Sequence, residues 1–92
     1  MATLRIPTPL RPYAAGQSEI TVQGNTVGEA LSEVVERYSS LKPHLFTSDG
    51  ELRPFINLFL NDEDIRKLND LDTPIKENDR LMILPSIAGG NV

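Results

Sequence analysis

One segment of the chain has the pattern of an amphipathic helix, and the rest of the fold has to be arranged around it. Its apolar residues recur at helical spacing and its charged residues cover the opposite side, which predicts a helix over residues 27–38. Thr26 precedes it and starts a capping box. The Thr26 hydroxyl can accept the amide of Glu29, and the Glu29 carboxylate can reach back to the amide of Thr26. Residues 39–40 and Pro43 are expected to end the helix.

The segments on either side of this helix have the patterns of β-strands. Two runs before it alternate between polar and apolar side chains, and Pro7 marks the end of the first run. After it comes a run rich in aromatic and apolar residues, then a short strand, then a last apolar run that stops at Pro85. The expected strands are residues 3–6, 18–23, 53–60, 65–68 and 80–84.

The chain has too few strands for a single helix to lie between two sheets. One mixed sheet packed on the helix is therefore the arrangement that buries the apolar face of the helix. The first and last strands can then pair in parallel at the centre of the sheet. This α+β arrangement is the β-grasp, the plan of ubiquitin, with four to five strands. We expect one domain over residues 1–85 and a flexible tail over 86–92. The predicted core contains Val27, Ala30, Leu31, Val34 and Val35 of the helix, and Ile6, Ile20, Val22, Ile56, Leu58 and Ile83 of the strands.

The composition argues against several classes of protein. The 92 residues contain no cysteine, which removes disulfides, thiolate metal sites and cysteine nucleophiles. A formal charge of −4 is unfavourable for a protein that must neutralise phosphates, so no nucleic-acid partner is expected. The first residues lack the apolar run of a secretory signal, and the longest apolar run, 55–60, is too short to span a membrane. We therefore expect a cytoplasmic protein with no membrane partner.

The body of the sequence offers no constellation for catalysis. His44 is the only histidine, and a surface or partly packed imidazole is the simplest interpretation. The three carboxylates of residues 61–64 lack the glycine and the closing glutamate of a calcium loop, which favours a solvated turn. We predict no catalytic residue and no metal site, and a chain that is not itself an enzyme.

The last seven residues, 86–92, carry no charged side chain, although 24% of the chain is charged. They follow a strand that ends at Pro85, and the adjacent Gly89 and Gly90 remove every Cβ clash over that stretch. Such a segment can thread a narrow channel and present a carboxylate, or it can be the frayed end that most domains have. Composition alone leaves both interpretations open.

Two segments, 55–66 and 79–90, together with the order of the elements, resemble the MoaD/ThiS family of ubiquitin-like sulfur carriers. The opening run 6–12 is most similar to the branch that carries sulfur for cysteine biosynthesis. The resemblance implies that an E1-like activating enzyme uses ATP to adenylate the carboxylate of Gly90, with Gly89 as the slender approach. The adenylate is then converted to a thiocarboxylate that donates sulfur. No cofactor is expected on the carrier itself.

The chain departs from the family pattern at two places. Asn78 stands where members commonly have glycine before the last strand, a mild change because asparagine tolerates a positive φ. Asn91 and Val92 follow Gly90, so Gly90 has no free carboxylate in the chain as written. The resemblance implies that a peptidase cleaves between Gly90 and Asn91. The cysteine branch of the family is associated with a zinc-dependent JAMM-type peptidase.

The resemblance also implies the partners that receive the sulfur. The expected acceptor is an activated serine derivative held on pyridoxal phosphate (PLP) in a PLP-dependent cysteine synthase. The alternatives among carriers are a molybdopterin precursor, as for the small subunit of molybdopterin synthase, a thiazole precursor or a tRNA base. The alternative outside the carriers is a ubiquitin-like interaction module that never reacts.

We expect partners to dock on an exposed apolar surface of the sheet beside the tail. Phe59, Leu60 and Leu84 are the candidates, because the strand positions next to them already supply the inward-facing residues. The alternative is that Leu60 and Leu84 pack under loops.

Overall fold

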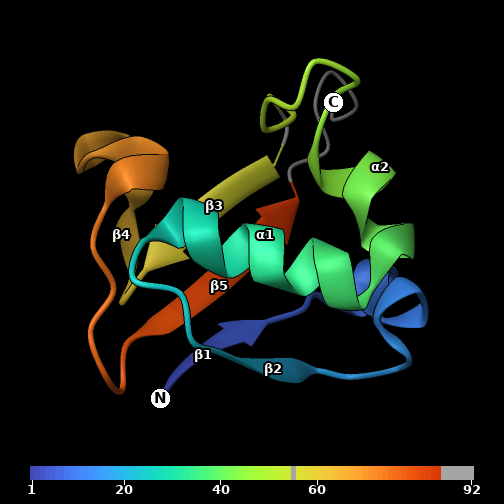
Figure 1. The fold of residues 1–92 in the computed structure, drawn as a ribbon, viewed down its shortest axis with the longest axis horizontal. Helices are drawn as coiled ribbons and strands as arrows, with labels where there is room; N and C mark the ends of the chain where they lie inside the picture. Colours follow the sequence, from blue (N-terminus) through green and yellow to red (C-terminus); the bar gives the residue numbers. More distant parts are fainter. Residues whose placement is uncertain (55, 86–92) are drawn as a thin grey trace.

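The computed structural model describes residues 1–54 and 56–85 of the chain. One long helix, α1 (Val27–Arg37), crosses one face of a five-stranded sheet (Figure 1). The strands lie in the order β2-β1-β5-β3-β4. Their bounds are Ala2–Arg5 for β1, Glu19–Val22 for β2, Ile56–Leu60 for β3, Glu63–Asp64 for β4 and Arg80–Pro85 for β5.

The two strands β1 and β5 run in parallel, although most of the chain separates them. Their register pairs Thr3 with Arg80 and Arg5 with Met82. Antiparallel partners flank this pair, β2 beside β1 and β3 beside β5. A parallel pair needs a long connection, and here the helix lies within it. The predicted β-grasp fold, a mixed sheet packed on one main helix, is confirmed.

The core lies between α1 and the sheet. Buried side chains alternate with more exposed ones along the four longer strands, as expected for a sheet that is covered on one face. All the predicted core residues are buried except Val35, which is half-buried and packs against the margin of the core. The helix contributes Val27, Ala30, Leu31 and Val34, each 0% exposed.

The capping box at the start of α1 forms only partly as predicted. Thr26 Oγ1 accepts the amide of Glu29 at 3.1 Å. The Glu29 carboxylate accepts the amide of Asn25 at 2.9 Å, so it binds the residue before the cap and not Thr26 itself. The incoming chain passes very close to the helix at this point, since a Cβ on Gly24 would lie 2.6 Å from the backbone nitrogen of Ala30.

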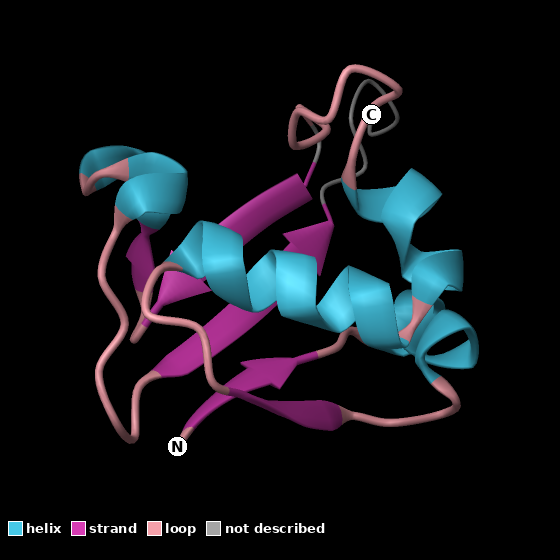
Figure 2. Ribbon diagram, in the orientation of Figure 1, coloured by secondary structure: helices cyan, strands magenta, loops and turns pink. Residues whose placement is uncertain are grey.

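Helical structure continues past the end that the sequence predicts. A 3-10 helix, Ser39–Leu41, and a single turn, α2 (Lys42–Leu45), follow α1 directly (Figure 2). Pro43 is compatible with α2 because it lies in the first turn, where a backbone N–H has no helical partner. Leu41 and Leu45 are both fully buried, so this extension adds to the core. No helix among the described residues is long and apolar enough to cross a membrane.

The strand predicted at 65–68 is wrong. Ile65–Lys67 forms a 3-10 helix, and the short strand β4 lies just before it. Asp64 causes the change, because its carboxylate accepts the amide of Arg66 at 2.9 Å and so caps the 3-10 helix.

Two further differences from the sequence prediction exceed one residue. β3 begins at Ile56, not at 53, because the Ile56 amide donates to the Arg53 carbonyl at 3.0 Å in a turn that contains Pro54. The connection between β1 and β2 contains a 3-10 helix at Thr8–Ala14, which the sequence pattern did not indicate.

Candidate functional site

The end of β5 is the root of the carboxyl-terminal segment. β5 pairs with β1 on one side and with β3 on the other (Figure 1). Its last residue, Pro85, stands opposite Ile56. The chain therefore leaves the sheet from a strand that is held on both sides. The predicted tail, 86–92, lies outside the described residues, and so do Gly89, Gly90 and Asn91, the residues predicted to be activated and processed.

The face of the sheet opposite α1, which we call the outer face, carries one row of side chains across all five strands. Residues that pair directly across neighbouring strands project on the same face, so the pairing register defines the row. It has charged ends and an apolar centre. From β2 to β4 the row runs Glu19, Arg5, Met82, Phe59 and Asp64.

The apolar centre of the outer face contains Phe59, Met82 and Leu84. Leu84 is 42% exposed and stands opposite Asn57, in the next row toward Pro85. Phe59 and Leu84 therefore lie where the sequence places them, and their docking role stays a prediction. Met82 was not among the predicted residues, although its spacing of two from Leu84 along the strand was the signal that could have found it.

Leu60 does not belong to the outer face. Its side chain is 8% exposed and pairs with the fully buried Leu81 on the helix side of the sheet. The spacing of two from Leu58 places it there. The prediction that Leu60 is part of an exposed apolar surface is therefore wrong.

A hydrogen-bond network fixes Arg66 at one end of the row. Its Nε donates to Asp64 Oδ1 at 3.1 Å, and its Nη2 donates to Asp64 Oδ2 at 2.7 Å and to Asn57 Oδ1 at 2.8 Å. The Asp64 side chain is only 17% exposed, whereas that of Arg66 is 61% exposed. Hydrogen bonds from the Arg66 side chain and then from its backbone lower the pKa of Asp64 from 3.8 to about 2. The Arg66 guanidinium is thus held by residues of two strands, Asp64 of β4 and Asn57 of β3.

The other end of the row carries a second pair. Arg5 Nη1 lies 3.7 Å from Glu19 Oε2. Arg80 lies one row away on the same face and forms no ion pair among residues 1–54 and 56–85. A hollow of about 440 Å³ opens beside these side chains, with Arg5, Arg80 and Met82 in its lining. The outer face therefore combines an apolar centre with three guanidinium groups, in a protein whose formal charge is −4.

The turn that leads into β5 is held by a second network. The Asp79 carboxylate accepts the Lys76 amide at 2.7 Å and the Asn61 side chain at 2.9 Å, and these bonds, in that order of importance, lower its pKa. Asn61 Oδ1 in turn accepts the Arg80 amide at 2.9 Å. Asn78 has a φ of 71°, so the asparagine adopts the positive φ that a glycine would take there, as expected.

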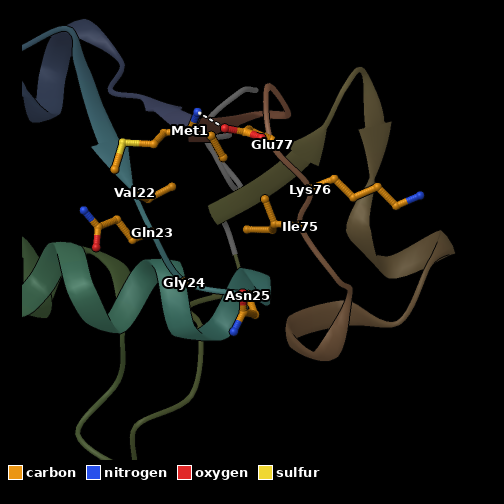
Figure 3. Close-up of a pocket in the computed structure, with 9 residues that line it drawn as sticks. Met1, Val22, Gln23, Gly24, Asn25, Ile75, Lys76 and Glu77 are labelled. Carbon is orange, nitrogen blue, oxygen red and sulfur yellow. Dashed lines mark ion pairs between the residues drawn. The ribbon is translucent and has the colours of Figure 1, made fainter.

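A shallow cleft lies at the opposite end of the sheet from Pro85, where β1 begins and β2 ends (Figure 3). It has a volume of about 350 Å³ and is lined by Met1, Gln23 and Lys76, among others. The Met1 amine lies 3.7 Å from the Glu77 carboxylate across its rim. Phe59, Leu60 and Leu84, the predicted site residues that the structure describes, do not line this cleft.

The remaining chemistry-bearing residues of the sequence are engaged structurally. The imidazole of His44 stacks on the ring of Tyr13, with 4.0 Å between the ring centroids. In the 61–64 turn, Asn61 binds Asp79 and Asp64 binds Arg66. Within the part of the chain that the structure describes, no three acidic, cysteine or histidine side chains converge on a common point that could hold a metal ion.

Comparisons of sequence and of structure with known proteins lead to the same relatives. The sulfur carrier protein CysO of Mycobacterium tuberculosis (strain ATCC 25618 / H37Rv) is 40% identical over 90 residues, which cover 96% of this chain and 97% of CysO. The crystal structure of Mycobacterium tuberculosis CysO matches with a TM-score of 0.85 and 37% identity, covering 95% of this chain and all of CysO. A chain of the Amycolatopsis orientalis BexX/CysO complex matches with a TM-score of 0.87 and 38% identity, covering 98% of this chain and 100% of that one.

The family assignment follows from a match of nearly the whole chain. Residues 4–90 match the sequence profile of the ThiS family. Of these, the described residues 4–54 and 56–85 contain α1 and most of the five-stranded sheet, and the Mycobacterium tuberculosis relative is named a sulfur carrier protein. The chain therefore belongs to the ThiS family.

Proposed function

We propose that this protein carries sulfur for cysteine biosynthesis, with the carboxylate of Gly90 as its reactive group. The observation that supports this most directly is the 40% identity to the sulfur carrier CysO over 90 residues. The family match extends through Gly90 and does not include Asn91 and Val92. This extent is consistent with Gly90 as the last residue of the active carrier.

The proposed chemistry starts with activation of a poor acyl donor. One oxygen of the Gly90 carboxylate attacks the α-phosphorus of ATP in the activating enzyme, pyrophosphate leaves, and an acyl-adenylate forms. Hydrosulfide, HS⁻, then attacks the acyl carbon and forms a C–S bond while the C–O bond to AMP breaks, so that AMP leaves and the S–H proton is lost to solvent. The product is a thiocarboxylate, which is nucleophilic at neutral pH. The carrier needs no thiol for this chemistry, in agreement with a chain that contains no cysteine.

The two residues after Gly90 have to be removed first. A peptidase of the JAMM type is the proposed processing enzyme, and it would cleave the bond between Gly90 and Asn91. Gly89 and Gly90 have no side chains, so this stretch can enter the narrow sites of the peptidase and of the activating enzyme.

The β-grasp domain supplies the affinity that such a tail lacks. Fixing each tail residue in a partner's site costs about 1–2 kcal/mol of conformational entropy, and the glycines bring no side chain to offset it. We propose that the E1-like activating enzyme docks on the outer face at Phe59, Met82 and Leu84. The PLP-dependent cysteine synthase then receives the thiocarboxylate. The BexX/CysO complex supports the idea that a carrier of this kind binds a second protein.

In this proposal the chain is a co-substrate, and its partners are the enzymes. It is expected in the cytoplasm, where ATP is available to the activating enzyme. A carrier for another acceptor, such as a molybdopterin precursor, would use the same Gly90 chemistry. A purely interacting module would not depend on Gly90 at all.

The test is activation of two forms of the protein by the cognate E1-like enzyme. ATP-dependent release of pyrophosphate is measured with protein that ends at Gly90 and with protein that ends at Val92. We expect release only with the first form, and none with its Gly90→Ala variant, which should fold normally. If neither form is activated by any such enzyme of the same cell, the interaction module becomes the better interpretation.

A further inference from the structure

Hydrogen bonds hold the Arg66 guanidinium in a fixed position at one end of the row on the outer face. This position indicates what kind of surface a partner presents to the row. Asp64 holds Arg66 through two nitrogens of the guanidinium, and Asn57 holds one of the same nitrogens from β3. Because Asn57 and Phe59 are two residues apart on that strand, the guanidinium lies at the border of the apolar centre.

Arg66 keeps unused hydrogen-bonding capacity at this border. A guanidinium has five N–H groups, and the network uses those on Nε and Nη2. The two N–H groups on Nη1 donate to no residue among 1–54 and 56–85. The side chain is 61% exposed, so a partner can reach it while Asp64 and Asn57 hold the guanidinium.

A long surface side chain normally loses conformational freedom when a partner binds it, at a cost of about 0.5–1.5 kcal/mol. Arg66 has lost most of this freedom before any partner arrives. An isolated surface ion pair contributes little to folding. Asp64 also caps the 3-10 helix, so the network has a local structural role and at the same time presents the Arg66 guanidinium to a partner in a fixed position.

The charge of the outer face indicates what the partner presents in return. Arg5, Arg66 and Arg80 lie on it, and two carboxylates, Glu19 and Asp64, pair with the first two. These five side chains sum to one positive charge, and Asp62, which lines the hollow beside Arg5 and Arg80, brings the sum to zero, in a chain whose formal charge is −4. The complementary surface is apolar at its centre with carboxylates at its margin.

We propose that Arg66 donates the N–H groups of Nη1 to a carboxylate of the activating enzyme, and that Asp64 and Asn57 are positioning residues for this contact. The carboxylate would lie beside an apolar side chain of the enzyme that packs on Phe59 and Met82. This inference rests on the proposed function, because it names the surface that the activating enzyme offers to this carrier.

The test uses carrier that ends at Gly90 and measures the KM for the carrier and the kcat of pyrophosphate release. Arg66→Lys keeps the charge but loses the fixed fork, and it should raise the KM about tenfold with little change in kcat. Asp64→Asn should also raise the KM severalfold, because it releases the guanidinium. Asparagine is itself a good helix cap, so the 3-10 helix should be retained.

The Asp64→Asn variant separates positioning from simple attraction. It makes the outer face more positive, so a role for charge alone predicts a lower KM, whereas positioning predicts a higher one. Asn57→Ala removes one anchor without changing any charge, and it should raise the KM by a smaller factor. Arg37→Lys is the matched control, since Arg37 also pairs with a carboxylate, Glu33 at 3.1 Å, but belongs to α1. Its KM should be unchanged.

The outcomes distinguish this inference from the proposed function. If unmodified carrier is activated but Arg66→Lys and Asn57→Ala leave the KM unchanged, or Asp64→Asn lowers it, the inference is wrong and the carrier function stands. If unmodified carrier is not activated, both are wrong. Thermal unfolding of each variant tests whether the domain is intact. If Asp64→Asn does not fold, the KM of Asn57→Ala tests whether Arg66 has to be positioned.

Discussion

Asp64 shows how far one side chain can organise a surface. Its carboxylate accepts the Arg66 amide, which ends β4 and starts a 3-10 helix, and it also fixes the Arg66 guanidinium on the outer face. The sequence pattern did not reveal this role. Residues 61–64 read as a solvated acidic turn, and the network depends on the positive φ angles of Asn61 (52°) and Asp62 (74°), which return the chain alongside β3.

Asp64 should titrate with a pKa of about 2, because the hydrogen bonds from Arg66 stabilise its ionised form. Its folded pKa lies below the ordinary value of 3.8, so its contribution to stability is complete above that pH and is lost as the pH falls toward 2. Arg66→Ala should move the pKa back toward 3.8. An NMR titration of the Asp64 carboxyl carbon measures both values, and a wild-type pKa near 3.8 would show that the network does not form in solution.

Gly24 is required where the connection between β2 and α1 passes close to the first turn of the helix. A Cβ there would lie 2.6 Å from the backbone nitrogen of Ala30, so Gly24→Ala should destabilise the fold by roughly 1–3 kcal/mol. Gly50→Asn is the control: no atom lies within 4 Å of the added Cβ, and asparagine tolerates the φ of +84°. Chemical denaturation measures both. Equal stability of the two variants would contradict the close approach.

At the scale of elements, the strong periodicity of apolar residues was enough to predict the positions of α1 and of the longer strands. The 3.6-residue spacing and Thr26 located the helix to within one residue, and alternation located the central strands. The same alternation places Leu60 inside and Met82 outside, so both errors were avoidable from parity alone. Thr8–Ala14 and α2 could not be predicted in this way, because they are too short for a periodic pattern and contain prolines, which usually end a helix.

The packing of α1 can be tested with two neighbouring valines. Val34 is 0% exposed in the core, whereas Val35 is only half-buried at its margin. Val34→Ala should therefore cost about 2 kcal/mol, and Val35→Ala clearly less. Both substitutions have the same effect on helix propensity, so the difference in unfolding free energy reports burial. A larger loss for Val35→Ala would mean that the helix is rotated on the sheet.

At the scale of the whole molecule, the two faces of the sheet have separate tasks. The inner face, with α1, holds the fold together, and the outer face is the surface that we propose for a partner. β5 joins the two tasks, because Ile83 points into the core while Met82 and Leu84 point outward beside the root of the tail. The sequence predicted an inward-facing set of strand residues and an exposed apolar surface. It did not predict that Arg5 and Arg66 frame the apolar centre, which only the pairing register of the strands shows.

The division between the two faces predicts opposite effects at adjacent positions of β5. Leu84→Asp should leave the protein folded and weaken binding to the activating enzyme, because Leu84 is 42% exposed on the outer face. Ile83→Asp should unfold the domain, because it places a charge at a site that is 1% exposed. Circular dichroism measures whether each variant is folded, and calorimetric titration measures binding of Leu84→Asp to the activating enzyme. Unfolding by Leu84→Asp would assign that residue to the core.

The proposed carrier function depends on what the carboxyl terminus becomes in the cell. Intact-protein mass spectrometry of the protein from its native cell tests this most directly. We expect a chain that ends at Gly90, part of which has one carboxylate oxygen replaced by sulfur. A chain that keeps Asn91 and Val92 under all growth conditions, with no sulfur added, would contradict the carrier function.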